Sequence, residues 1–322
     1  MNKTPLVSIL VPIYNVEQHL GKCLDSIFSQ TYENLEYVFV DDCSTDNSLD
    51  VLATSLAKHN IPNEKATIIK HKANEGIAVS RNDCIKNAHG EYVQFIDSDD
   101  WIEPNMTEEL VKATNEGKID IIGCDYAKDF LSEKKTFHKE NYAETCHENM
   151  LRSLNYDIST VLWKLLIRKQ LFNCFQIDPN INIGEDYIIS IKLFYYANSF
   201  SCVHKFLYHY VQHNTNRLSF QIRRSLNDHI KAVKAVEYFC RDKEIYNERT
   251  RHLIMLRKFN IKSNFLTKNL LDYNEYRTTF PEANRIWREM GYSRNEKIKF
   301  WLAEKKLYFI LKMILGKQSL NK

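Results

Sequence analysis

The run Asp97-Ser98-Asp99-Asp100 gathers three carboxylates directly after the apolar stretch 92–96. That stretch has the aromatic and β-branched residues typical of a strand, so the carboxylates are expected at the end of a sheet. Like charges this close repel one another unless they face a cation, a ligand or open solvent. Two carboxylates one residue apart suit a hard divalent metal and, through it, a phosphate. A solvated corner between strand and loop, with a helix cap, is the alternative.

A second acidic pair, Asp41 and Asp42, stands at the end of another apolar stretch that begins at Leu35. Carboxylates in this position can accept hydrogen bonds from a nucleotide base or a ribose. Capping of the next helix by Ser44 or Asp46 is the alternative reading of the segment, and the two readings are compatible.

Two further charged positions could contact a ligand. Arg81 falls in the first turns of a helix predicted over 77–88, where the helix dipole disfavours a cation, so it is either a ligand contact or an exposed surface residue. Glu185 and Asp186 open the helix predicted over 184–197. Acids at a helix N-terminus are favourable by up to about 1 kcal/mol in any protein. One of them could instead be the base that a weakly acidic sugar hydroxyl needs as it attacks.

Alternating strands and helices position these residues. Strands are predicted over 6–13, 35–41, 66–70, 91–97 and 119–124, and helices over 17–30, 46–58, 77–88 and 105–116. This order predicts parallel βαβ units, hence an α/β fold with a mostly parallel sheet flanked by helices. Ligands of such sheets bind at the carboxyl ends of the strands. Both acidic groups are therefore expected on the same edge.

The second half of the chain is less regular at first and then helical. After the irregular stretch 130–182 come the helix over 184–197 and one or two strands over 200–211. Further helices are predicted from 222 onward, over 247–270, 282–290 and 294–315. We therefore expect a ligand-binding and catalytic domain over 1–218 and a mainly helical extension over 219–322.

Composition describes an ordinary globular protein of 322 residues with 44% apolar and 26% charged residues. The sequence has no run of 18 apolar residues, so no membrane-spanning helix is predicted. The eight cysteines form no Cys-x-x-Cys pair and no signal peptide is expected, which favours reduced thiols in the cytoplasm. Residues 205–322 hold 25 Lys and Arg against 11 Asp and Glu, which indicates an anionic partner or a solvated basic surface.

Several classes of protein are disfavoured. No Gly-x-Gly-x-x-Gly follows the first strand, no Walker A loop is present, and no Cys/His set has zinc spacing. A nucleotidyltransferase would have a Gly-rich basic loop after the first strand, where this chain has the segment 12–17. No nucleic-acid partner is expected.

The N-terminal third resembles family 2 glycosyltransferases, which have the Rossmann-like GT-A fold. The matching segments are 7–15, 40–46, 74–76 with Arg81-Asn82, and 90–100, followed in the middle of the chain by 163–165, 171–172, 184–186 and 207–210. The resemblance implies that Pro12, Tyr14 and Glu17 line the nucleotide pocket. It also implies that Asp42, with Asp41, contacts the base, usually uracil.

The remaining roles follow from the same resemblance. Arg81 would contact the base or the phosphates, and Asp97 would lie near the ribose. Asp99 would bind Mn²⁺ or Mg²⁺ that holds the diphosphate. Asp186 resembles the catalytic base, with Glu185 as its neighbour or substitute. The family leaves two roles open for the last carboxylate of the run, Asp100, which would contact the donor sugar or orient the loop.

Three positions depart from the pattern of the family. Cys43 and Cys84 stand where Gly is usual, and a side chain at either place narrows the backbone conformations available. Val211 stands where the family often has Arg. The phosphate contact of that Arg could pass to His213 or Arg217.

The resemblance implies an inverting, metal-assisted glycosyltransferase of the bacterial polysaccharide type. It would move a hexosyl or N-acetylhexosaminyl group from a UDP-linked donor to a hydroxyl of a glycan or lipid-linked acceptor. The alternative is a catalytically weak protein that binds glycans or membrane surfaces. The segment 294–322 motivates it, because eight Lys and Arg alternate there with large apolar residues against two acids. That segment could meet an anionic membrane surface on the cytoplasmic side, or it could pack as a core helix.

Overall fold

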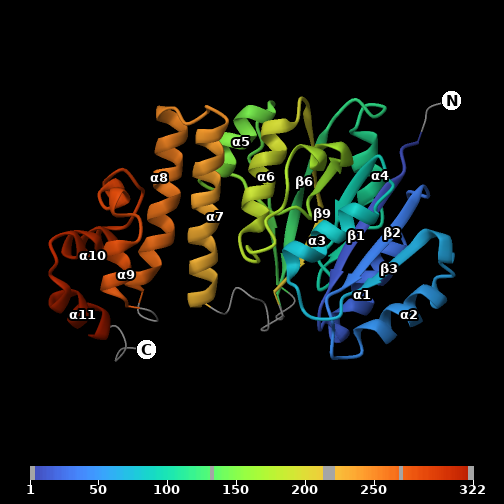
Figure 1. Ribbon diagram of the computed structural model, residues 1–322, viewed down its shortest axis with the longest axis horizontal. Coiled ribbons are helices and arrows are strands. Elements are labelled where there is room, and N and C mark those ends of the chain that lie inside the picture. The colour runs from blue at the N-terminus through green and yellow to red at the C-terminus, as the bar shows by residue number, and fades with distance from the viewer. Residues whose placement is uncertain (1–3, 131–133, 213–221, 268–270, 318–322) are drawn as a thin grey trace. The chain divides into compact units, whose positions relative to one another are not determined.

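The computed structural model describes residues 4–130, 134–212, 222–267 and 271–317 (Figure 1). The chain divides into two compact units. The first contains Met1–Ser153 and Asp157–Phe220, and the second contains Leu154–Tyr156 and Gln221–Lys322.

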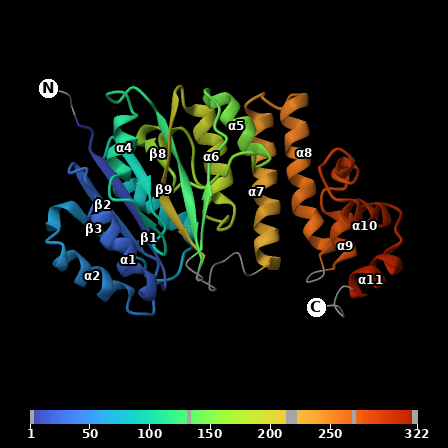
Figure 2. The same cartoon turned by 180° about the vertical axis from the view of Figure 1, so that it is seen from behind.

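One sheet forms the centre of the first unit, with helices on its faces (Figures 1 and 2). Its strand order is β3-β2-β1-β4-β8-β6-β9-β5, and β7 pairs with β6. The first four strands, β1 (Val7–Ile13), β2 (Leu35–Asp41), β3 (Ala66–Lys70) and β4 (Tyr92–Phe95), pair in parallel. Since β2 and β4 lie on opposite sides of β1, the chain reverses its direction of travel at β1. Such a switch point opens a crevice at the carboxyl ends of the strands.

The other strands extend the sheet beyond β4. They are β5 (Trp101–Ile102), β6 (Ile121–Asp129), β7 (Lys135–His138), β8 (Leu165–Arg168) and β9 (Phe200–Val211). Strands β6 and β9 are parallel to each other, and the pairs β4–β8, β6–β8, β6–β7 and β5–β9 are antiparallel. The predicted α/β class is confirmed. The stretch 200–211 is one strand.

The helices of the first unit are α1 (Glu17–Phe28), α2 (Ser48–Lys58), α3 (Ile77–Asn87), α4 (Met106–Lys112), α5 (Cys146–Leu154) and α6 (Glu185–Tyr196). Helix α1 buries the apolar stripe Leu20, Cys23, Leu24 and Ile27 because these residues share one face. The starts of α1 and α2 are linked by reciprocal hydrogen bonds. The Glu17 amide donates to Asp46 at 3.0 Å, and the Glu17 carboxylate accepts from the Asn47 amide at 2.8 Å.

The second unit is helical. Its helices are α7 (Ile222–Asp242), α8 (Glu248–Ser263), α9 (Tyr273–Thr278), α10 (Arg294–Glu304) and α11 (Tyr308–Lys317). The helix predicted over 282–290 is wrong: two short 3₁₀ turns, Pro281–Ala283 and Ile286–Arg288, occupy that stretch. No helix in the part of the chain that the structure describes is long and apolar enough to cross a membrane.

The single helix predicted over 294–315 is also wrong, because α10 and α11 are separate. Lys306 adopts a left-handed conformation with φ 59° and ends α10. The Leu307 amide donates to the Leu302 carbonyl at 2.9 Å, and the Lys306 amide donates to Ala303 at 3.0 Å. This pair of bonds is a Schellman cap, which usually carries Gly at the left-handed position. The apolar periodicity of the segment gave no sign of it.

Candidate functional site

Both acidic groups predicted from the sequence stand at the same edge of the sheet. Strands β2 and β4 are each parallel to β1, so Asp41 and Asp42 lie after one carboxyl end and Asp97 after another. The Asp42 carboxylate is buried. It accepts hydrogen bonds from the amides of Glu75 and Gly76, both at 2.8 Å. Asp42 therefore anchors the loop that leads into α3.

Arg81 on α3 connects the carboxylates of the site. Its side chain is 3% exposed. The guanidinium lies 3.5 Å from Asp97, 3.4 Å from Glu185 and 3.2 Å from Asp186. These partners come from the loop after β4 and from the start of α6, so one buried cation joins three elements. The predicted contact of Arg81 with the base or the phosphates stays a prediction.

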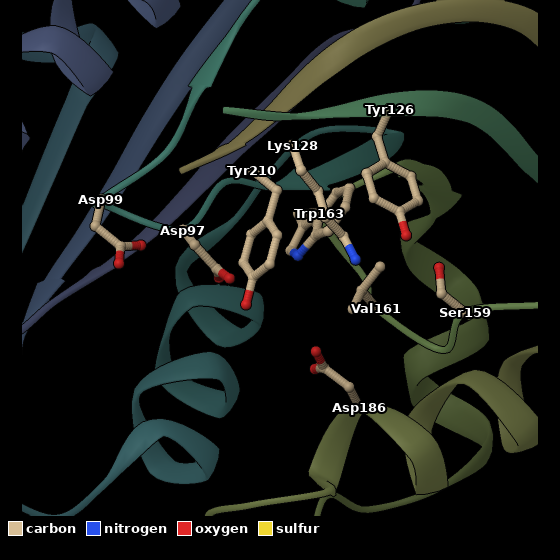
Figure 3. A pocket seen from close by; sticks show the side chains of 9 residues that line it. All are labelled: Asp97, Asp99, Tyr126, Lys128, Ser159, Val161, Trp163, Asp186 and Tyr210. Carbon is tan, nitrogen blue, oxygen red and sulfur yellow. The ribbon is translucent and has the colours of Figure 1, made fainter. Parts of the chain in front are cut away.

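A cavity of about 420 Å³ opens beside these carboxylates (Figure 3). Its lining residues are Asp97, Asp99, Tyr126, Lys128, Ser159, Val161, Trp163, Asp186 and Tyr210. In the close view, Asp97 and Asp99 border one side of the space and the Asp186 carboxylate enters it from α6. Carboxylates that are far apart in the sequence thus meet around one cavity.

The start of α6 separates the roles of its two acids. Gly184 takes a left-handed conformation with φ 87°, which suits a residue without Cβ. The Glu185 side chain is 9% exposed and the Asp186 side chain 19%, and only Asp186 lines the cavity with Asp97 and Asp99. Burial raises the pKa of both acids above the usual range, and Arg81 opposes the rise. Their mutual repulsion raises the pKa of Glu185 further.

Asp100 does not line the cavity. It is 1% exposed, and its carboxylate accepts hydrogen bonds from the Tyr208 hydroxyl and the Val211 amide, both at 2.8 Å. The Asp97 amide donates to the same Tyr208 hydroxyl at 3.2 Å. These bonds tie the loop after β4 to β9. Val211, where the family often has Arg, contributes through its backbone amide.

Aromatic side chains form a wall of the cavity. The ring of Trp163 stacks on Tyr208 with centroids 4.0 Å apart and lies parallel to Tyr210 at 5.8 Å. Tyr126 meets the edge of Trp163 at 5.0 Å. Such a wall offers flat apolar faces next to polar edges.

Sequence reasoning did not single out Tyr126, Lys128 or Ser159 as site residues. Tyr126 and Lys128 are two residues apart on β6, so their side chains share a face of the sheet. That spacing could have indicated the pair once the strand was known to extend past 124. Ser159 had no signal in the sequence.

A buried ion pair supports Ser159 from behind. Lys164 is 1% exposed and lies 2.7 Å from Glu140. The Lys164 ammonium also donates to the Ser159 hydroxyl at 2.7 Å, and Glu140 accepts from the Ser159 amide at 3.1 Å. Burial lowers the pKa of Lys164 to about 8, while Glu140 opposes that shift. The pair holds Ser159 in place at the cavity wall.

The predicted nucleotide contacts lie around the end of β1. Pro12 is buried within the strand, and Tyr14 is exposed after it, at 47%. The carboxylate of Glu17 accepts a hydrogen bond from the Asn47 amide at the start of α2. Asp41 is buried, with Ser44 as its nearest donor at 3.3 Å. The predicted phosphate contacts His213 and Arg217 lie outside the described residues.

The residues that depart from the family differ in their surroundings. Cys43 has φ 61°, a left-handed conformation that explains a preference for Gly. Cys84 lies in α3, is fully buried, and its thiol points to the Val38 carbonyl at 4.0 Å. A Gly at this second position would leave a hole in the core.

The carboxylates at the cavity could supply only some of the ligands that a hard divalent metal ion needs. Asp97 and Asp99 offer carboxylate oxygens, which Mg²⁺ and Mn²⁺ prefer. Among the described residues, however, no group of three His, Cys, Asp or Glu side chains could hold a metal alone. An ion bound at Asp99 would therefore take its other ligands from a diphosphate and water.

The chain belongs to glycosyl transferase family 2, whose model matches residues 8–175. The putative glycosyltransferase EpsH of Bacillus subtilis is 33% identical over 226 residues, which cover 66% of this chain and 62% of that protein. Glycosyltransferase GlyA of Streptococcus pneumoniae is 33% identical over 216 residues, 63% of this chain and 30% of that protein. The chain thus spans less than two thirds of the length of these two relatives.

Solved structures show the same fold. S. aureus TarS 1–349 in complex with UDP-GlcNAc matches with a TM-score of 0.69 at 16% identity, over 98% of this chain and 92% of that chain. The mannosyltransferase PcManGT from Pyrobaculum calidifontis, in complex with GDP-Man and Mn²⁺, matches with a TM-score of 0.54 at 17% identity, over 98% and 85%. The predicted family and the GT-A fold are confirmed.

Proposed function

We propose that the protein is an inverting glycosyltransferase that moves a sugar from a UDP-linked donor to a hydroxyl of a glycan or lipid-linked acceptor. The observation that carries the proposal is the cavity in which Asp186 faces Asp97 and Asp99. One wall supplies carboxylates for a diphosphate-bound metal, and the other supplies a base. A complex of S. aureus TarS with UDP-GlcNAc supports a UDP-linked donor on this fold.

Asp186 is the proposed base. Its carboxylate enters the cavity, and its raised pKa makes it a stronger base than an exposed Asp. It takes the proton of the acceptor hydroxyl as the hydroxyl oxygen attacks the anomeric carbon. The bond from that carbon to the diphosphate breaks on the opposite side. One such displacement inverts the anomeric centre.

The proposed diphosphate site comprises Asp99 and Lys128. Asp99 would hold Mn²⁺ or Mg²⁺, which supplies positive charge for the leaving diphosphate. Lys128 has no ion-pair partner within the described residues and faces the same cavity, where an anionic group would pair with it. Arg81 opposes the rise in the pKa of Asp186 that burial causes, and its ion pairs with Asp97 and Asp186 would hold both carboxylates in place. Asp97 would contact the ribose.

The nucleotide base would bind at the carboxyl ends of the parallel strands, where residues of several loops meet. Tyr14 is the exposed aromatic side chain after β1 and would stack on the base, with Pro12 and Asp41 beside it. Asp42 and Glu17 would shape this pocket through the loops that they anchor. Asp100 orients the loop after β4, in preference to touching the donor sugar.

The aromatic wall supports a sugar acceptor or donor over a purely polar ligand. Trp163 and Tyr210 offer flat faces to the apolar face of a pyranose. A glycan-binding protein without catalysis would need the same wall. It would not need Asp186 and Asp99 together, which favours the enzyme.

A donor panel tests this function. Thermal shift with UDP-, GDP- and dTDP-linked sugars, each with Mn²⁺, Mg²⁺ or EDTA, should show stabilisation by one UDP-sugar that depends on the metal. Asp99→Ala should remove the metal dependence, whereas the exposed Asp178→Asn should retain it. NMR of the product should show an inverted anomeric centre. Retention of configuration would refute the proposal. So would stabilisation by the UDP-sugar that depends neither on the metal nor on Asp99.

A further inference from the structure

The second unit exposes an unusual concentration of apolar side chains on α10 and α11, which are coloured red at the end of the chain in Figures 1 and 2. Seven of the twelve large exposed apolar residues among the described residues fall between 298 and 314. These seven are Ile298, Trp301, Leu307, Phe309, Ile310, Met313 and Ile314. A cluster of this kind usually marks an interaction site.

Helix α10 has two distinct faces. Phe300, Leu302 and Ala303 are buried, and the ring of Phe300 meets Phe259 of α8 edge-on with centroids 4.9 Å apart. On another face, Ile298 is 43% exposed and Trp301 44%. The helix therefore packs as a core element and still presents an aromatic and a branched side chain to the outside.

Between Tyr308 and Ile314, helix α11 has both buried and exposed side chains. Leu311 is fully buried, and Tyr308 stacks on Tyr273 with centroids 4.5 Å apart. Phe309 and Met313 stand one turn apart, 74% and 49% exposed, and Ile310 and Ile314 repeat the spacing beside them. Residues four apart share one helix face, so these four side chains form a single apolar stripe.

Basic residues are interspersed with these apolar residues along the sequence. Between 294 and 314 the chain has six Lys and Arg and two acids. Both acids already have partners. Glu296 completes the capping box with Ser293, and Glu304 pairs with Arg288 at 2.8 Å. The positive charge of the segment is therefore left for an outside partner.

A cavity of about 440 Å³ lies against the same helix. Its lining residues are Trp287, Tyr292, Arg294, Lys297, Ile298 and Trp301. Two tryptophans and an isoleucine give it an apolar floor, and Arg294 and Lys297 add two cations. This combination suits a ligand with an anionic head and an apolar tail.

We propose that α10 and α11 dock the protein on the surface of a bilayer that contains anionic phospholipids. The apolar stripe and Trp301 enter the boundary between headgroups and acyl chains, and the lysines and arginines contact the phosphates. A second copy of the chain fits less well, because two surfaces with this excess of Lys and Arg repel each other. The interaction holds the protein at the membrane surface through α10 and α11.

Vesicle co-sedimentation of the full chain tests the proposal, with vesicles of phosphatidylcholine alone or with 30% phosphatidylglycerol. We expect binding to the anionic vesicles that weakens as salt rises. Phe309→Ser with Met313→Ser should weaken it about tenfold or more, since both side chains are exposed and contribute by burial in the lipid. Lys305→Glu with Lys312→Glu should have the same effect. Tyr238→Ser on α7 is the matched control, because Tyr238 is 73% exposed, and it should bind as the wild type does.

Three results would overturn the proposal. They are no binding to anionic vesicles, equal binding by the Phe309 and Met313 double variant, and concentration-dependent self-association that this variant abolishes in sedimentation velocity. UDP binding, measured on the same samples without lipid, should be equal in all variants. A loss of vesicle binding with intact UDP binding separates this proposal from the proposed function.

Discussion

Replacing Arg81 with Met should destabilise the protein, and the loss should grow with pH. The guanidinium is 3% exposed and lies within 3.5 Å of Asp97, Glu185 and Asp186. Met fills much of the same volume but leaves the carboxylates without a buried cation. Removing one partner of a buried ion pair costs about 3–5 kcal/mol. Asp97 is 31% exposed and can be solvated, so Glu185 and Asp186 should account for most of the loss.

The direction of the pH dependence follows from the raised pKa of Glu185 and Asp186. Arg81 lowers both pKa values, so Arg81→Met should raise them further. A carboxyl whose pKa is raised in the folded state binds its proton more tightly there than in the unfolded chain. Its contribution to stability is complete below the unfolded pKa and is lost as pH rises through the folded pKa. The gap between wild type and variant should therefore be small near pH 5 and largest near pH 8.

Urea unfolding followed by circular dichroism at pH 5 and pH 8 measures this gap. The double variant Arg81→Met with Glu185→Gln should recover part of the loss at pH 8, because one buried carboxylate is gone. Arg168→Met is a useful control: Arg168 also pairs with two acids, Asp120 at 2.8 Å and Glu91 at 3.1 Å, but does not line the cavity. It should lose stability and keep UDP binding. An equal loss at both pH values, or no recovery in the double variant, would refute the reasoning.

Three further predictions concern single positions. The acidic limb of the kcat profile should lie at a pH above the usual pKa range of an aspartic acid, because burial raises the pKa of Asp186 and the base must be ionised; a limb near pH 4 would contradict this. Lys128→Ala should weaken the binding of UDP by about ten- to a hundredfold, because Lys128 belongs to the proposed diphosphate site; calorimetry measures this, and an unchanged Kd for UDP would argue against the assignment. Cys43→Gly should raise the free energy of unfolding by about 0.5–1 kcal/mol, since φ is 61° there, and urea unfolding that shows a loss would disprove the strain.

The strands and the helix that carry the site residues could be predicted, because each depends on the pattern of apolar residues within its own segment. The apolar stretches over 35–41 and 66–70 match β2 and β3 residue for residue. Since parallel strands share their carboxyl edge, the approach of the two acidic groups followed from the strand order alone. The prediction of a helix from 184 to 197 differs from α6 by one residue at each end.

The contacts inside the site could not be predicted, because they join residues that no local pattern connects. Arg81 meets Glu185 across 104 positions of sequence. Its place in the first turns of a helix left open whether Arg81 contacts a ligand or lies on the surface, and it gave no sign of the buried acids that Arg81 meets. Ser159 is held at the cavity wall by a buried ion pair between Lys164 and Glu140, which are 24 positions apart, and no pattern in the sequence pairs them. Likewise, the left-handed Lys306 divides α10 from α11 where periodicity predicts one helix.

The proposed role of Asp186 is tested most directly by Asp186→Asn, measured for both donor binding and turnover. Asn keeps the size of the side chain and its place at the cavity but cannot accept the proton of the acceptor. The account predicts that UDP-sugar binds the variant with a Kd within about threefold of the wild type, while kcat falls by about 10²- to 10⁴-fold. Turnover close to that of the wild type would contradict the account.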